Sequence, residues 1–331
     1  HNRCRRQRQM CIRDRQDQVR HLDCYIKLND HEVTVFSDIP SNENQLIEQL
    51  QPFEVLVLIR ERTIITPNLL KNLPNLKLIS QTGKISNHLN LTDCDQHQVA
   101  VAEGIGSPIA PSELCWSLIM AASRHIPAYL ERFKQGHWQQ SGQPTLGRTL
   151  NGQTLGIWGF GKIGQRIAKY AEVFGMQVIV WGSESSRQNA VEMGYQAASS
   201  RETFFEQCDV ISLHLRLNDA TRHIVSQKDL DAMKSDSLLV NISRAELIEP
   251  NALYQTLATA PTKQAAVDVF DYEPATKDNE PLLSLPNVIA TPHLGYVEQG
   301  SYELYFQHAF DNILSFAKGD YSNIANAYIL E

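Results

Sequence analysis

The chain has 331 residues, of which 42% are hydrophobic and 20% are charged, and its formal net charge is −7 at pH 7. This length predicts two domains rather than one core, and the negative charge argues against nucleic-acid binding. No apolar run approaches the ~18 residues of a membrane span and no signal-peptide pattern is present, so we expect a cytoplasmic protein without a membrane partner.

The first 20 residues are unusually basic, with seven arginines against two aspartates. No aromatic residues or amphipathic face support a binding arm here, so we interpret residues 1–7 as disordered or non-native. A strand is expected around Met10–Ile12. We expect it to be short and poorly packed, because burying Arg8 or Arg13 without a partner would be costly.

The rest of the first third alternates strand-like runs with helical patterns. The strand candidates are Val33–Phe36, Val55–Ile59, Leu76–Ser80 and Val99–Ala102. Helices are expected at Ser41–Leu50 and Pro67–Asn72. Such alternation predicts a mostly parallel sheet. A longer helical stretch opens at Ser112, and a loop rich in Gly, Gln and Pro follows at Gln139–Gly152.

A second α/β series begins at Thr154. Its expected strands are Leu155–Trp158, Gln177–Trp181, Val210–Leu213, Leu238–Asn241, Ala265–Val269 and Val288–Ala290. Helical patterns cover Ile163–Phe174 and Gln299–Phe316. The last segment, Tyr321–Glu331, is too short for a domain and is expected to return to the first one.

Six cysteines are scattered along the chain without the spacing of a metal site. They are Cys4, Cys11, Cys24, Cys94, Cys115 and Cys208. No CxxC or CxxH pattern occurs among them. We therefore expect reduced thiols and no metal site.

A glycine-rich turn follows the first strand of the second series. It reads Gly159-Phe160-Gly161-Lys162-Ile163-Gly164, which is GxGxxG between a strand and a helix. The first glycine permits the turn, the second lets a pyrophosphate approach, and the third lets helix and strand pack closely. The helix N-terminus then offers N–H groups to the phosphates. The pattern predicts a dinucleotide site.

The choice between NAD and NADP depends on the end of the next strand. An acidic residue for the ribose is expected about 20 residues after the turn. Position 182 is a glycine, followed by small polar residues and Arg187, which could accept a 2′-phosphate. Glu184 could still bind the ribose, so both cofactors stay open.

Three polar segments follow three strand candidates near the C-terminus. They are Asn241–Arg244, Asp268–Pro274 and Thr291–Gly295, and they supply a guanidinium, carboxylates and an imidazole. Open α/β sheets bind ligands at such strand ends. An Arg can hold a carboxylate by two hydrogen bonds, and a His held by a Glu can transfer a proton near neutral pH.

In this order, the glycine turn, the Cys208–His214 strand and the three polar segments resemble the D-isomer-specific 2-hydroxyacid dehydrogenases. The resemblance runs from about Gln16 to Asp320. It implies two doubly wound α/β domains, with a Rossmann-type NAD(P)-binding domain inserted in a flavodoxin-like substrate domain. The implied division is 8–105 plus 298–331 for the substrate domain and 106–297 for the cofactor domain.

The resemblance also implies roles for individual residues. Arg244 would bind the substrate's carboxylate and carbonyl oxygen, His293 would be the general acid/base, and Glu273 would hold the imidazole. Asp268 corresponds to the residue near the nicotinamide ring. The full set of implied cofactor contacts is Gly159, Phe160, Gly161, Lys162, Ile163, Gly164, Trp181, Gly182, Ser183, His214, Leu215, Arg216, Thr221, Ile242, Ser243, Asp268 and Gly295. A homodimer formed through the cofactor domain is implied as well.

The loop that binds the substrate's carboxylate in the family departs from the usual pattern here. The corresponding residues are Thr82, Gly83, Lys84 and Ile85. Only one glycine of the usual pair is present, and Lys84 adds a positive charge. This departure concerns the choice of substrate rather than the chemistry.

The expected function is hydride transfer between a nicotinamide cofactor and a small 2-oxo or D-2-hydroxy acid. The alternative is an NAD(H)-sensing binding protein or corepressor with the same fold and little turnover. Retention of Arg244, Glu273 and His293 together favours the enzyme. A formate dehydrogenase is disfavoured, because that branch pairs its His with Gln rather than Glu.

Overall fold

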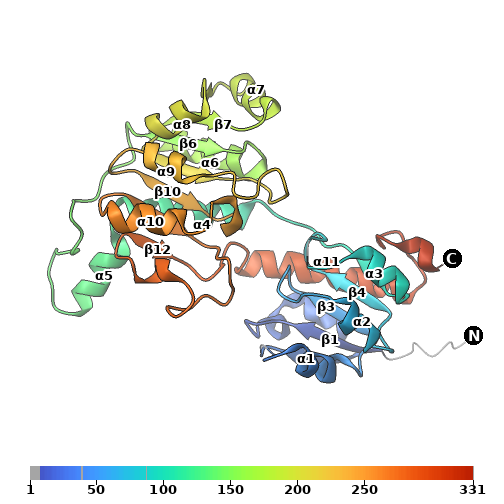
Figure 1. The fold of residues 1–331 in the computed structure, drawn as a ribbon. Coiled ribbons are helices and arrows are strands. Elements are labelled where there is room, and N and C mark those ends of the chain that lie inside the picture. The colour runs from blue at the N-terminus through green and yellow to red at the C-terminus, as the bar shows by residue number, and fades with distance from the viewer. Residues whose placement is uncertain (1–7, 39, 87, 331) are drawn as a thin grey trace, which may run out of the picture. The chain divides into compact units, whose positions relative to one another are not determined.

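The structure is a computed structural model that describes residues 8–38, 40–86 and 88–330. The chain divides into two compact units (Figure 1). Unit 1 comprises the described residues of 1–107 and 298–331, and unit 2 comprises 108–297. The sequence places these breaks at 105/106 and 297/298. The expectation for residues 1–7 lies outside the described residues.

Unit 1 is built on a five-stranded sheet whose order is β2-β1-β3-β4-β5, and all its strand pairs are parallel. This is the flavodoxin-like order. The strands are β1 (Gln9–Arg13), β2 (Glu32–Phe36), β3 (Val55–Leu58), β4 (Leu78–Gln81) and β5 (Ala100–Ala102).

Helices cover the sheet of unit 1 on both faces, as a parallel sheet requires. One face packs against α1 (Glu43–Leu50), α2 (Pro67–Lys71) and α3 (Leu91–Gln96), of which α3 was not expected. Helix α11 (Gln299–Ala317) packs against β4, where Ser80 Oγ donates to the Ala309 carbonyl at 2.9 Å. The short 3-10 turns of this unit are η1 (Val19–His21), η2 (Asp23–Leu28) and η5 (Ala327–Leu330).

The prediction that the strand at Met10–Ile12 is poorly packed is wrong. Strand β1 lies inside the sheet, between β2 and β3, and these three residues are fully buried. The flanking arginines avoid an unpaired burial. Arg13 donates to the Asp38 carbonyl at 2.9 Å, and Arg8 forms an ion pair with Glu54 at 3.8 Å. The apolar centre of the strand is therefore buried while both flanking guanidinium groups keep a polar partner.

Unit 2 contains a seven-stranded sheet, again with every pair parallel. Its order is β12-β11-β10-β9-β6-β7-β8, which is the Rossmann order extended by one strand. The strands are β6 (Thr154–Trp158), β7 (Gln177–Trp181), β8 (Gln196–Ala197), β9 (Val210–Leu213), β10 (Leu238–Asn241), β11 (Gln264–Val267) and β12 (Val288–Ala290). The strand order reverses between β6 and β9, where such sheets bind ligands. Together the two sheets confirm the predicted fold class.

Two layers of helices enclose this sheet (Figure 1). One layer contains α4 (Ile109–Ser123), α6 (Lys162–Val173) and α7 (Glu184–Glu192). The other contains α8 (Arg201–Gln207), α9 (Gln227–Ala232) and α10 (Ala252–Thr259), with the short turns η3 (Ala245–Leu247) and η4 (Pro281–Ser284).

The long helical stretch expected from Ser112 is two helices. It begins at Ile109, ends at Ser123, and resumes as α5 (Ile126–Lys134) after His125, whose φ is +52°. Helix α5 has no buried residue. Among the described residues, no helix combines the length and the apolar character needed to cross a membrane.

Candidate active site

The turn after β6 requires glycine at two positions, because neighbouring backbone atoms leave no room for a side chain. Gly159 has a φ of +97°, and an added Cβ would lie 2.6 Å from the His214 carbonyl oxygen. At Gly164, a Cβ would lie 2.3 Å from the Gly159 carbonyl oxygen. A side chain at either position would therefore force β6, β9 and α6 apart.

Gly161 is different, because an added Cβ would meet no protein atom within 4 Å. This glycine is the N-cap of α6, and no side chain caps the helix there. The first N–H groups of this 12-residue helix thus have no capping side chain, and they lie at the positive end of its dipole. The arrangement fits the pyrophosphate of a dinucleotide. Phe160 is buried and Ile163 packs against the core, so these two would contribute through the backbone.

The end of β7 gathers hydroxyl groups and a guanidinium. Ser183 Oγ lies 3.0 Å from Ser185 Oγ and 3.1 Å from Ser186 Oγ, at the N-terminus of α7. Arg187 stacks over the ring of Trp181 at 4.9 Å. The glycine at 182 has a φ of +147°, a conformation in which an acidic residue would be strained.

His214 is a half-buried residue that follows β9. Its Nε2 lies 2.9 Å from Ser212 Oγ, which lies 3.3 Å from the Sγ of Cys115. Burial lowers the pKa of His214 to about 4. Further along, Thr221 donates its hydroxyl to the Arg216 carbonyl at 2.6 Å, which holds the loop after Leu215 together.

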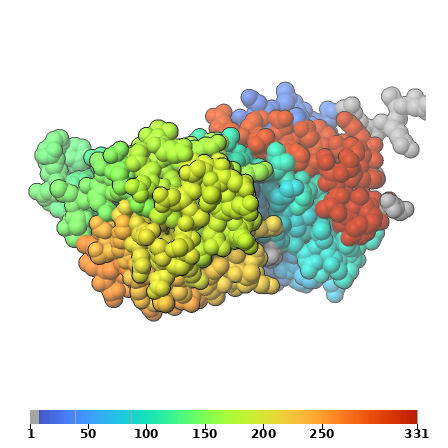
Figure 2. All heavy atoms as spheres, turned by 90° about the horizontal axis from the view of Figure 1, so that it is seen from above, coloured from blue at the N-terminus to red at the C-terminus, as the bar shows by residue number. Residues whose placement is uncertain are grey.

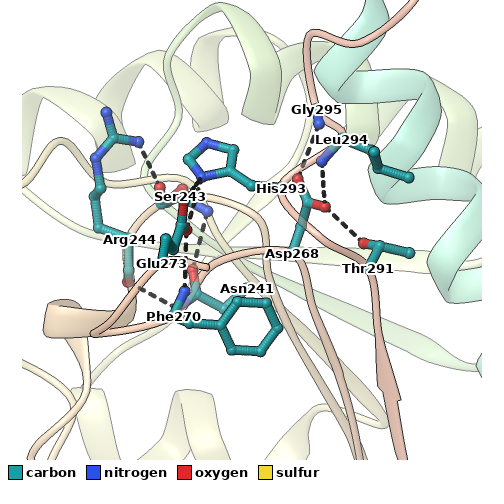
Figure 3. Close-up of polar contacts among 10 residues, drawn as sticks. All are labelled: Asn241, Ser243, Arg244, Asp268, Phe270, Glu273, Thr291, His293, Leu294 and Gly295. Atoms are coloured by element: carbon teal, nitrogen blue, oxygen red, sulfur yellow. Dashed lines mark hydrogen bonds and ion pairs between the residues drawn. The ribbon is translucent and has the colours of Figure 1, made fainter. Parts of the chain in front are cut away.

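Arg244 follows β10 in a turn that Asn241 organises (Figure 3). The Asn241 side chain is buried; it donates to the Arg244 carbonyl at 2.8 Å and accepts from the Ser243 amide at 3.0 Å. Ser243 in turn donates to the Leu213 carbonyl at 2.8 Å. Next to it, Ile242 is buried in the core. The backbone that carries the half-buried guanidinium is therefore fixed to β9 and β10.

Glu273 and His293 form a direct pair. His293 Nδ1 lies 2.8 Å from Oε1 and 2.9 Å from Oε2 of Glu273, and each side chain is about one quarter exposed. Glu273 also accepts from the Phe270 amide at 3.4 Å. The loops that carry Arg244, Glu273 and His293 follow β10, β11 and β12, which are neighbours in the sheet. The three side chains therefore share one edge of unit 2 (Figure 3).

Asp268 is the buried centre of the His293 turn. One of its carboxylate oxygens accepts from the Thr291 hydroxyl at 2.6 Å and the Leu294 amide at 2.7 Å, and the other accepts from the Gly295 amide at 2.9 Å (Figure 3). Burial raises the pKa of Asp268, while these donors oppose the rise. His293 within this turn has a φ of +55°, an uncommon conformation for a residue with a side chain. The hydrogen bonds to Asp268 stabilise this strained backbone conformation and so fix the position of the imidazole.

The loop at residues 82–85 lies in unit 1 and offers fewer amide donors than expected. The Thr82 amide already donates to the Leu58 carbonyl at 3.0 Å, and the Ile85 amide donates to Glu103 Oε1 at 3.0 Å. Within the described residues, the N–H groups of Gly83 and Lys84 donate to no protein acceptor. Two consecutive N–H groups are therefore available for an anion.

Comparisons with known proteins bear on unit 2 and on the whole chain. The model of the family described as "D-isomer specific 2-hydroxyacid dehydrogenase, NAD binding domain" matches residues 116–295, which is more than half of the chain. The chain belongs to this family.

Three proteins similar to this chain are named as a reductase, a dehydrogenase and an oxidoreductase. The hydroxypyruvate reductase of Thermotoga maritima is 33% identical over 271 residues, covering 81% of this chain and 86% of the relative. The D-3-phosphoglycerate dehydrogenase of Methanocaldococcus jannaschii is 34% identical, and the match spans 76% of this chain but only 48% of that longer protein. The phosphoglycerate oxidoreductase of Vibrio cholerae is 62% identical, with a TM-score of 0.92 and coverage of 95% of this chain and 99% of that one.

Membership settles the general function of this dehydrogenase-family chain, which is that of an oxidoreductase with a nicotinamide cofactor. The sequence did not single out Glu103, whose position after β5 was its only signal. The structure adds a second task for Asp268, whose two carboxylate oxygens both accept hydrogen bonds from the His293 turn. Among the described residues, no cluster of three or more His, Cys, Asp or Glu could hold a metal ion.

Proposed function

We propose that Arg244, Glu273 and His293 carry out the reversible reduction of small 2-oxo acids to D-2-hydroxy acids. The Glu273–His293 pair supports this most directly, since Nδ1 of the imidazole is held at 2.8 Å by the carboxylate. The other nitrogen, Nε2, is then the one that carries the transferable proton. Arg244, on the neighbouring strand end, supplies the charge and the geometry to hold a carboxylate.

Each residue has one task in the proposed mechanism. Arg244 holds the carboxylate and limits the motion of the carbonyl carbon. When bound, a reduced nicotinamide supplies a hydride to C2. His293 Nε2 gives a proton to the carbonyl oxygen as that oxygen gains charge, and Glu273 stabilises the imidazolium before the transfer. The product is the 2-hydroxy acid, and in the reverse direction His293 accepts the proton.

For the cofactor we propose NADP(H) rather than NAD(H). A 2′-phosphate needs donors and positive charge where the strand after the glycine turn ends. The three serine hydroxyls at the start of α7 and the guanidinium of Arg187 gather there, and position 182 carries no carboxylate. Stacking on Trp181 limits the motion of Arg187, which lowers the entropy lost on binding a phosphate.

An initial-rate screen of 2-oxo acids with NADH and NADPH in parallel tests both proposals. We expect turnover of at least one acid, and a KM for NADPH about tenfold or more below that for NADH, the size of one or two charge-assisted hydrogen bonds. Oxidation of neither cofactor with any acid would favour the binding-protein alternative.

The variant Arg187→Ala should raise the KM for NADPH about tenfold and change that for NADH little. Arg166→Ala is a matched control, because Arg166 also stacks on an aromatic ring of unit 2, that of Tyr170, at 5.8 Å. A preference for NADH in the wild type would contradict the proposal and point to Glu184 as the ribose ligand.

We also propose a homodimer that forms through unit 2. Helix α5 and the segment after it project from the body of this unit (Figures 1 and 2). Leu130, Phe133 and Trp138 are 55%, 57% and 70% exposed, and the rings of the last two lie 5.7 Å apart. Apolar side chains gathered on one exposed segment are typical of an interface.

The double variant Phe133→Asp, Trp138→Asp should convert the dimer to a monomer, because it would bury two charges in the interface. Sedimentation equilibrium measures the mass directly. Ile26→Asp is the control, since Ile26 is 70% exposed but lies in unit 1. A double variant that keeps the mass of two chains would exclude α5 from the interface.

We propose a reducing, cytoplasmic setting for the chain. The five cysteines within the described residues are free and buried: Cys11, Cys24, Cys94, Cys115 and Cys208. Burial raises the pKa of the Cys11 thiol to about 12, which keeps it protonated. Reduced, unreactive thiols are typical of cytosolic proteins.

A further inference from the structure

We propose that the Lys84–Glu103 ion pair makes the loop at residues 82–85 select 2-oxo acids that carry a single negative charge. The inference rests on the proposed function, the reduction of 2-oxo acids, and it adds the Gly83 and Lys84 N–H groups of this loop as a binding site for the substrate's carboxylate. It concerns only side chains of unit 1. Neither the family resemblance nor the relatives' names assign a role to Glu103.

Glu103 contacts the loop through both of its carboxylate oxygens. Oε1 accepts from the Ile85 amide at 3.0 Å, and Oε2 lies 2.8 Å from Lys84 Nζ. The same carboxylate therefore fixes the loop's backbone and neutralises its extra positive charge. The main chain of Glu103 is held in place as well, because the buried Asn312 of α11 donates to its carbonyl at 3.0 Å.

The loop at residues 82–85 is in direct backbone contact with the segment 103–104, which follows β5. The Gly104 amide donates to the Gly83 carbonyl at 2.8 Å, and a Cβ on Gly104 would lie 2.5 Å from the Gly83 nitrogen. Only a glycine allows this approach. The contact and the Glu103 carboxylate together fix the backbone that carries the Gly83 and Lys84 N–H groups, which we infer to be the receptor for one carboxylate.

The extra positive charge that Lys84 brings to this receptor is neutralised by Glu103. The Lys84 side chain is 65% exposed and would attract a second anionic group if it were alone, but Glu103 pairs with it and is itself one third exposed. A substrate with two negative charges must displace Glu103 from Lys84 or lie next to its carboxylate. Arg60, which stacks over Tyr305 at 5.6 Å beside Gly83, contributes the same charge in every variant below.

The test compares two anions of similar size on the cofactor-loaded protein. Oxamate carries one negative charge and tartronate carries two, and calorimetry gives a Kd for each. The ratio of the tartronate Kd to the oxamate Kd is the readout. In Glu103→Gln, the amide oxygen can still accept from Ile85, but the charge on Lys84 is uncovered. We expect the ratio to fall about three- to fivefold, the size of one partly exposed ion pair.

Lys84→Met should move the same ratio in the opposite direction, because it removes the positive charge that neutralises the Glu103 carboxylate. A purely structural role of the pair would shift both variants in the same direction. Glu54→Gln is the matched control. It removes a carboxylate that pairs with Lys77 at 3.1 Å and with Arg8 at 3.8 Å, next to the opposite ends of β3 and β4, and should leave the ratio unchanged.

The outcomes separate this inference from the proposed function. Opposite shifts in Glu103→Gln and Lys84→Met support charge selection, even if the wild type turns over no 2-oxo acid. Unchanged ratios, or shifts in one direction, overturn the inference while turnover of 2-oxo acids can persist. Failure of the wild type to bind either anion overturns it as well, because the loop would then be no receptor.

Discussion

His293→Gln should reduce 2-oxo acids about 10²- to 10⁴-fold more slowly than the wild type, the usual loss when a general acid is removed. Glutamine approximates the size of the imidazole and can still donate to Glu273, so the turn between Thr291 and Gly295 should keep its shape. It cannot deliver a proton to the substrate's oxygen near neutral pH. The effect should therefore fall on kcat, measured at saturating cofactor and substrate.

Two measurements show whether the loss is chemical rather than structural. The Kd for the reduced cofactor should stay within about threefold of the wild type, well under one charge-assisted hydrogen bond, because the glycine turn at Gly159–Gly164 is unchanged. His137→Gln is the control, since His137 is an exposed histidine of the same unit. A kcat within twofold of the wild type in His293→Gln would show that His293 is not the acid.

Arg244→Ala should lower kcat/KM about 10²- to 10⁴-fold, largely through KM. Each charge-assisted hydrogen bond to a carboxylate contributes about 1.5–3 kcal/mol, and a guanidinium can make two of them side by side. Arg244→Lys keeps the charge but not the planar pair of donors, so it should recover only part of the loss. Steady-state kinetics with the best 2-oxo acid from the screen measures all three proteins.

A second arginine of unit 2 serves as the control for Arg244. Arg148 is partly buried and forms an ion pair with Asp236 at 2.7 Å, away from the polar strand ends that carry the candidate site. Arg148→Ala should lower stability more than kcat/KM. Equal losses of kcat/KM in both alanine variants would indicate a general effect of removing a partly buried guanidinium and would contradict a substrate-binding role for Arg244.

Much of the fold follows from the sequence because buried parallel strands have a strong local signal. Strands covered on both faces are continuous apolar runs. The strands at Gln177–Trp181 and Val210–Leu213 accordingly have the bounds that their residues predict. The two-residue β8 has no such run. Strand β1 was misjudged, because the partners that make Arg8 and Arg13 tolerable come from distant parts of the chain.

The sequence by itself determined which chemical groups stand at the ends of β10, β11 and β12, because the order of the strands and the residue after each one are local properties. Only the tertiary structure decided how those groups are held. Asp268 accepts three hydrogen bonds from the turn around His293, and Glu103 takes the Ile85 amide that was expected to bind substrate. These hydrogen-bond partners are more than 15 residues apart, so their pairing depends on how strands and loops pack. A local residue pattern does not specify which donor pairs with which acceptor.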